Sequence, residues 1–251
     1  MPVGALFLAT SVALGNPFSG PNPQGGNLTW SGFSNGSVAA SISGNNGASY
    51  ENVLAGQFVG FFDPNSEADA PGAEADDFLR FFCIDISQSA AGGPLPYTRT
   101  LGVPDATRAA QLTRLFDQFY PNKTTGTYYS AGPTNFGSFA SADESAGFQL
   151  AVWEIWFDTD DNLSLSGGSF RATGPSAVIS EAQAELNFVH AGSGTAAGWT
   201  LYEFTNQGKQ DYLSVEHSGP LKTVPEPGTL ILLGVGALAA WGTSKHHRKT
   251  A

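Results

Sequence analysis

The stretch FLRFFCIDIS, residues 78–87, contains Cys83, the only cysteine among the 251 residues of the chain. Aromatic and β-branched residues fill this stretch and no helix signal interrupts it, which predicts a half-buried strand. A lone cysteine cannot form a disulfide within its own chain. The strand therefore sets one thiol in apolar surroundings, and the segments that pack beside it decide what the thiol does.

Helices and further strands are predicted on both sides of this segment. Asp105 caps a first helix, which ends before Pro121. Ser141 and Glu144 form a capping box at a second helix, and Ser176 caps a third. Strands are predicted at residues 28–33, 50–62, 199–205 and 212–216. We therefore expect an α+β domain, with a β-rich sheet or sandwich core and helices inserted between its strands.

The charge of the chain argues against one class of partner. Acidic residues outnumber basic residues by 22 to 11, which gives a net charge of −11. Such a chain repels phosphate backbones, so no nucleic-acid partner is expected. Charged residues make up only 13% of the sequence, about half the usual globular share. A polar but mostly neutral surface of this kind is typical of extracellular proteins.

The first 15 residues, MPVGALFLATSVALG, form an apolar stretch that ends in small residues. This pattern is typical of a secretory signal peptide cut after Gly15. The basic residues that normally precede the apolar stretch are missing, so we expect the true start to lie upstream. The predicted organisation is a signal-like segment over residues 1–15, a folded domain over residues 16–220 and a sorting tail over residues 221–251.

The tail combines three elements in order. VPEPGT at residues 224–229 is followed by an apolar run over residues 230–241 and then by clustered basic residues. Basic residues behind an apolar run hold such a segment in a bilayer with its end on the cytoplasmic side. The run is shorter than the roughly 20 residues of a full membrane span, which suits a transient anchor.

These three elements resemble the PEP-CTERM sorting signal of Gram-negative bacteria, with Pro225, Glu226 and Pro227 as its motif. The resemblance implies export and transient anchoring in the membrane through a short C-terminal transmembrane helix. It also implies cleavage near the motif by an exosortase-type processing protease, and delivery to the cell surface or extracellular matrix.

Gln149 is a second polar residue in an apolar segment, FQLAVWEIW, at residues 148–156. A buried amide must find hydrogen bonds, whereas a buried thiol packs as a small hydrophobic group. Attack of the Cys83 sulfur on the Gln149 carboxamide would expel ammonia and leave a thioester, which removes the amide donors altogether.

The two segments resemble the thioester domain of Gram-positive surface adhesins. Phe82 and Cys83 match its aromatic-Cys motif, and the run from Phe148 and Gln149 to Trp153 matches its apolar-Gln-x-Ala-apolar-Trp motif. The resemblance implies a thioester bond between Cys83 and Gln149 in a pocket walled by Phe82, Phe148 and Trp153. An amine-bearing surface or matrix polymer would open this thioester and be bound covalently. Each domain would react once, so neither enzymatic turnover nor a cofactor is expected.

Two other interpretations stay open. The chain is suited to an inert structural or carbohydrate-associated matrix protein in which Cys83 is buried and unreacted. Alternatively, Cys83 and His190 would form a hydrolase pair oriented by Asp85 or Glu154, although no local nucleophile motif supports that pair.

A calcium site is also considered and set aside. Asp158, Asp160 and Asn162 resemble the start of a calcium-binding loop. Leu163 stands where such a loop needs glycine, and Ser169 stands where it needs glutamate. No metal site is therefore expected.

Overall fold

The computed structural model describes residues 21–64, 78–121, 137–158, 162–192 and 198–217. All of them belong to the first of two compact units, residues 1–220, and the second unit comprises residues 221–251. The predicted signal-like segment and sorting tail lie outside the described residues. Among the residues that are described, no helix is long and apolar enough to cross a membrane.

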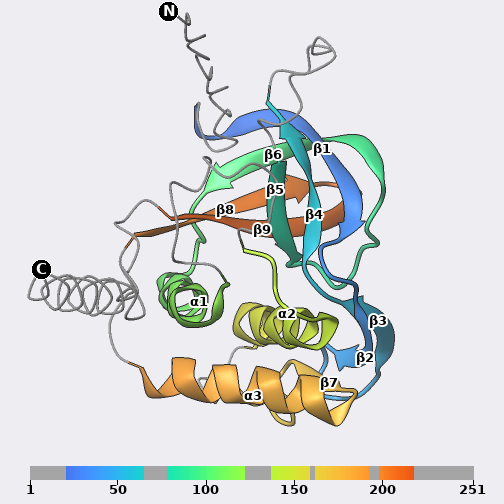
Figure 1. The fold of residues 1–251 in the computed structure, drawn as a ribbon, viewed down its shortest axis with the longest axis vertical. Coiled ribbons are helices and arrows are strands. Elements are labelled where there is room, and N and C mark those ends of the chain that lie inside the picture. Colours follow the sequence, from blue (N-terminus) through green and yellow to red (C-terminus); the bar gives the residue numbers. More distant parts are fainter. Residues whose placement is uncertain (1–20, 65–77, 122–136, 159–161, 193–197, 218–251) are drawn as a thin grey trace, which may run out of the picture. The chain divides into compact units, whose positions relative to one another are not determined.

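Six antiparallel strands close into a barrel in the order β1-β4-β5-β9-β8-β6 (Figure 1). The strands are β1 (Gln24–Phe33), β4 (Phe58–Asp63), β5 (Phe78–Cys83), β6 (Gly93–Leu101), β8 (Trp199–Asn206) and β9 (Lys209–His217). Side chains of β4 alternate between buried and half-buried, as expected for a strand with one face in a core. The predicted α+β class is confirmed, but the main sheet is a closed barrel and not an open sheet or sandwich.

A small second sheet has the order β3-β2-β7, formed by β2 (Val38–Ser43), β3 (Glu51–Ala55) and β7 (Arg171–Thr173). Residues 50–62, predicted as one strand, are therefore two strands in different sheets. The break falls at Gly56, where a Cβ would lie 2.9 Å from the carbonyl oxygen of Gly36. This close backbone approach leaves room only for glycine, and it ends one strand where the next sheet begins.

Three helices pack against the sheets: α1 (Ala106–Phe119), α2 (Ala142–Phe157) and α3 (Ser176–Ala191). Asp105 caps α1 and Ser141 caps α2, as predicted. The predicted Ser176 cap is wrong, because Ser176 is the first helical residue and follows Pro175, which offers no side-chain cap. α2 lies between the barrel and α3 (Figure 1), and every residue from Ser145 to Ile155 is buried.

Glu185 of α3 is a buried acid, with 3% of its surface exposed. Burial raises the pKa of its carboxyl well above the usual range, and the charges of Glu181 and Glu144 raise it further. The native state therefore binds this proton more tightly than the unfolded chain does. The protonated Glu185 carboxyl contributes fully to stability below the pKa that it has in the unfolded chain, and this contribution is lost as the pH rises through its native pKa.

We expect Glu185→Gln to remove the loss of stability that deprotonation of Glu185 causes as the pH rises. The free energy of unfolding of the variant, measured by urea titration, should fall less steeply than that of the wild type as the pH rises above 4.5, the ordinary glutamate value. Glu51→Gln is the control, because Glu51 is exposed and is not among the charges that raise the pKa of Glu185. Parallel pH profiles for Glu185→Gln and the wild type would contradict this assignment.

Candidate functional site

Cys83 and Gln149 meet through two hydrogen bonds. The main-chain N–H of Cys83 donates to Gln149 Oε1 at 3.0 Å, and Gln149 Nε2 donates to the main-chain oxygen of Cys83 at 3.0 Å. Neither residue has any exposed surface. The structure therefore brings together the last residue of β5 and the middle of α2, which are 66 positions apart in the sequence. Gln149 therefore lies inside the core.

The strand pairing explains why the Cys83 main chain needs such a partner. On one side Cys83 pairs with Tyr212 of β9. On the other side β4 begins at Phe58, opposite Phe81, so none of the described strands continues alongside Cys83. The Gln149 carboxamide occupies the vacant place and offers one donor and one acceptor, as a strand residue would.

The thiol of Cys83 is protonated at neutral pH. Burial raises its pKa to about 12, and the negative charges of Asp85 and Asp211 act in the same direction. Its Sγ donates to the carbonyl oxygen of Asp85 at 3.1 Å. The indole N–H of Trp153 faces the thiol and lowers its pKa, yet Trp153 Nε1 forms no hydrogen bond of normal geometry with any described residue.

Cys83 and Trp153 line a pocket of about 310 Å³. Its other lining residues are mostly aromatic or aliphatic and come from β1, β2, β3, β4, β9 and the loop after β5. They are Trp30, Phe33, Ile42, Val53, Leu54, Phe58, Ile86, Gln88, Ser89, Ala90 and Gln210. Sequence reasoning missed all of them, because segments distant from both motifs supply these walls.

Phe82 and Phe148 lie in a different place from Trp153. Their rings pack against each other with centroids 4.9 Å apart, and both rings contact Phe116 of α1. Successive residues of a strand point to opposite faces, so Phe82 faces the helices while Cys83 faces the pocket. Of the three aromatic residues expected around the site, the pocket contains Trp153.

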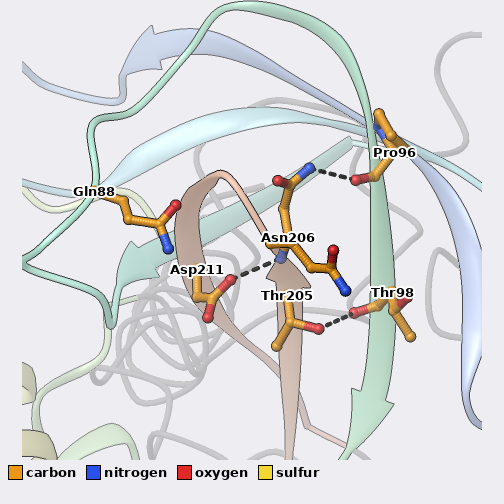
Figure 2. Close-up of a pocket in the computed structure, with 7 residues that line it drawn as sticks. Gln88, Pro96, Thr98, Thr205, Asn206 and Asp211 are labelled. Carbon is orange, nitrogen blue, oxygen red and sulfur yellow. Dashed lines mark hydrogen bonds between the residues drawn. The ribbon is translucent and has the colours of Figure 1, made fainter.

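A second pocket has a volume of about 680 Å³, and Figure 2 shows the residues that line it. Asn206 Nδ2 donates to the carbonyl oxygen of Pro96 at 2.6 Å, and Asp211 Oδ1 accepts from the main-chain N–H of Asn206 at 2.8 Å. Gln88 lines both pockets. The second pocket is lined mostly by polar residues, and none of its described lining residues is a cysteine.

The other residues considered from the sequence do not join the site. His190 is exposed in the last turn of α3, and the groups that shift the pKa of Cys83 do not include it. Asp158 Oδ1 accepts from the main-chain N–H of Ser169 at 3.2 Å, while Asp160 lies outside the described residues. Within the described part of the chain, no three acidic, histidine or cysteine side chains are grouped to hold a metal ion.

Comparison with known proteins assigns the tail. Residues 223–249 match the model of the PEP-CTERM protein-sorting motif, so the predicted sorting signal, with Pro225, Glu226 and Pro227, is confirmed as a sequence motif. The motif implies processing by exosortase-type sorting machinery. The chain is thus of the class of exported, surface-sorted proteins. No curated protein is similar enough to the whole chain to be matched.

Among solved structures, the chain is similar to domains of Gram-positive surface proteins. The N-terminal thioester domain of a surface protein from Clostridium perfringens is 12% identical, with 70% of this chain and 97% of that chain covered and a TM-score of 0.34. The N-terminal domain of the Streptococcus pyogenes pilus tip adhesin Cpa is also 12% identical, with 80% and 100% covered and a TM-score of 0.34. Another structure of the pilus-presented adhesin Cpa is 11% identical, with 77% of this chain and 67% of that chain covered and a TM-score of 0.37. At these values the similarity establishes no shared chemistry.

Proposed function

We propose that the domain forms a thioester between Cys83 Sγ and the side chain of Gln149 and uses it to capture an amine-bearing partner covalently. The observation that carries this proposal is the paired hydrogen bonding of the Gln149 carboxamide to the main chain of Cys83. These bonds hold the Gln149 carboxamide against the main chain of the residue that carries the only thiol of the chain, and both residues are fully buried.

The bond changes balance in two steps. In the first, sulfur bonds to the amide carbon, the C–N bond breaks, and the thiol proton leaves with nitrogen as ammonia. In the second, the nitrogen of an incoming amine bonds to the same carbon, the C–S bond breaks, and a proton from the amine returns to sulfur. In both steps the N–H of Cys83, 3.0 Å from Oε1, would stabilise the negative charge that develops on that oxygen.

The sorting tail supports a location for this capture. We propose cleavage near Pro225, Glu226 and Pro227 after transient anchoring through the apolar run at residues 230–241. The released domain would act at the cell surface or in the extracellular matrix, on an amine-bearing surface or matrix polymer. Capture occurs once per molecule, so the protein is not an enzyme.

A structural role for Gln149 is the second candidate function of this contact. The same two hydrogen bonds complete the end of β5, which alone would suit an inert structural or carbohydrate-associated matrix protein. The two candidates differ in covalent chemistry, which a mass measurement detects.

The intact mass of the exported protein tests the proposal. We expect the wild-type mass to be lower by one ammonia than the mass that the mature sequence requires, and methylamine to raise it by one methylamine while exposing one titratable thiol. Cys83→Ala is the control and should show the full sequence mass with and without methylamine. A wild-type protein of full sequence mass, with a thiol that titrates before any amine is added, would leave the structural role as the better account.

A further inference from the structure

The pocket that reaches Cys83 contains two buried polar atoms that lack partners. Gln210 Oε1 and Trp153 Nε1 are both inaccessible to solvent, and neither forms a hydrogen bond with a described residue. Both residues line the pocket together with Cys83. The indole N–H of Trp153 is directed at the Cys83 sulfur. Gln210 Oε1 has no such neighbour, and because a buried acceptor without a partner is costly, its presence at this cavity points to a ligand that donates to it.

Gln210 is held firmly in this position. Its main-chain N–H donates to Ser89 at 3.4 Å, and its carbonyl oxygen accepts from the Tyr97 hydroxyl at 2.9 Å. Its Nε2 donates to the carbonyl oxygen of Asp85 at 3.1 Å, the same atom that accepts from Cys83 Sγ. Because Nε2 is committed to that oxygen, Oε1 is the atom left for the pocket, which Cys83 also lines.

We propose that the pocket recognises an unbranched primary alkylamine, whose nitrogen is bound by Gln210 Oε1 beside Cys83. The inference deepens the proposed function, on which its covalent step rests, but binding itself needs no thioester. An amine N–H is the donor that Gln210 Oε1 lacks. The indole N–H of Trp153 faces sulfur, where it would stabilise the departing thiolate.

The walls of the pocket define the rest of the ligand. Its volume of about 310 Å³ is at the small end of the range of about 300–1,000 Å³ for ligand pockets. The rings of Trp30, Phe33 and Phe58 line it and suit both a methylene chain and a cationic head. None of its described lining residues is charged, so a carboxylate on the ligand would be desolvated without a partner.

Charge near the pocket favours an amine before it enters. Asp85 and Asp211 lie close enough to Cys83 to influence its titration, and neither lines the pocket. These carboxylates attract an ammonium ion to the entrance. At the pocket the ammonium head donates to Gln210 Oε1 and lies against the aromatic rings, and because the apolar walls lower its pKa it releases a proton to water before the nitrogen attacks.

Binding of three matched probes to the full chain carrying Cys83→Ala tests the proposal without a thioester. The probes are n-pentylamine, 1-pentanol and pentanoate, which share an apolar stem and differ in the head group. Titration followed by tryptophan fluorescence or calorimetry should show n-pentylamine binding at least about tenfold more tightly than the other two, as one charge-assisted hydrogen bond requires. Equal affinity for all three would overturn the proposal, because the pocket would then be merely apolar.

Three further variants in the Cys83→Ala background test whether Gln210 binds the amine or only holds the loop after β5 through Asp85. Gln210→Met should weaken the binding of n-pentylamine by about tenfold and that of 1-pentanol by less, because a neutral hydroxyl donates a weaker hydrogen bond to Gln210 Oε1 than an ammonium does. Gln210→Glu keeps an acceptor while losing the Nε2 bond to Asp85, so it should retain amine binding. Gln88→Met removes an amide from the same pocket and should change nothing. If Gln210→Glu fails as Gln210→Met does, Gln210 only tethers the loop and the proposal is wrong.

The outcomes distinguish this inference from the proposed function. If the Cys83→Ala protein binds the amine selectively and the wild type has its full sequence mass, the recognition site is supported and the thioester proposal is contradicted. If the wild-type mass is lower by one ammonia and the Cys83→Ala protein does not bind n-pentylamine, the thioester is supported and the proposed recognition site is contradicted.

Discussion

Replacing Gln149 by methionine is expected to abolish amine capture and, independently of capture, to lower the free energy of unfolding by about 3 kcal/mol. Methionine has a similar length, but its thioether is only a weak acceptor for the N–H of Cys83 and cannot donate a hydrogen bond to the Cys83 carbonyl oxygen. Both main-chain groups would remain buried without partners, since β4 does not extend alongside them.

The effect on stability is best measured by urea unfolding in a Cys83→Ala background, where no thioester can form and residue 83 keeps its main-chain groups. Leu150→Met, at the next position of α2, is the matched control. It exchanges one buried apolar side chain for another and should cost less than about 1.5 kcal/mol. If Gln149→Met were no more costly than this control, Gln149 would not complete the β5 strand.

Gly60→Ala is expected to destabilise the barrel by more than about 3 kcal/mol, because a methyl group has no space there. Gly60 pairs with Trp30 where β4 meets β1. A Cβ at this position would lie 2.0 Å from the carbonyl oxygen of Thr29 and 3.1 Å from the Phe81 ring. The first contact involves backbone, so relief requires the two strands to separate, which also disturbs β5 next to them.

Gly25→Ala provides the control for this prediction. Gly25 lies on β1, and a Cβ there would meet no atom within 4 Å. Alanine restricts the unfolded chain more than glycine does, so this variant should be neutral or slightly stabilising. Comparable loss of stability in the two variants, measured by urea unfolding, would contradict a specific role for close approach at Gly60.

Local signals predicted the parts of the fold that local chemistry controls. The caps at Asp105 and Ser141 defined where α1 and α2 begin, and aromatic strand patterns located β5, β8 and β9. β6 was missed because Pro94 and Pro96 interrupt its pattern, although both residues pair with β1. Closure of the barrel was also beyond sequence reasoning, because it depends on pairing between distant strands such as β1 and β6.

In the candidate site, too, only the residues with unusual local sequence surroundings could be predicted. The pairing of Cys83 with Gln149 was predicted from two segments whose polar residues were unusual for their surroundings. Gln210 was not, because a glutamine in a strand beside charged residues has no local peculiarity. Its importance comes from three contacts with Ser89, Tyr97 and Asp85, which exist only after the barrel has closed.

The burial of α2 has a mechanical consequence for a domain that captures a partner. In the proposed function the captured partner would be joined to Gln149 and Cys83 would be released, so a pulling force would enter the protein through α2 and not through the barrel strand. The helix is enclosed from Ser145 to Ile155 between the barrel and α3. Pulling it out sideways would break packing along three turns together, so resistance to load would be shared over many weak contacts.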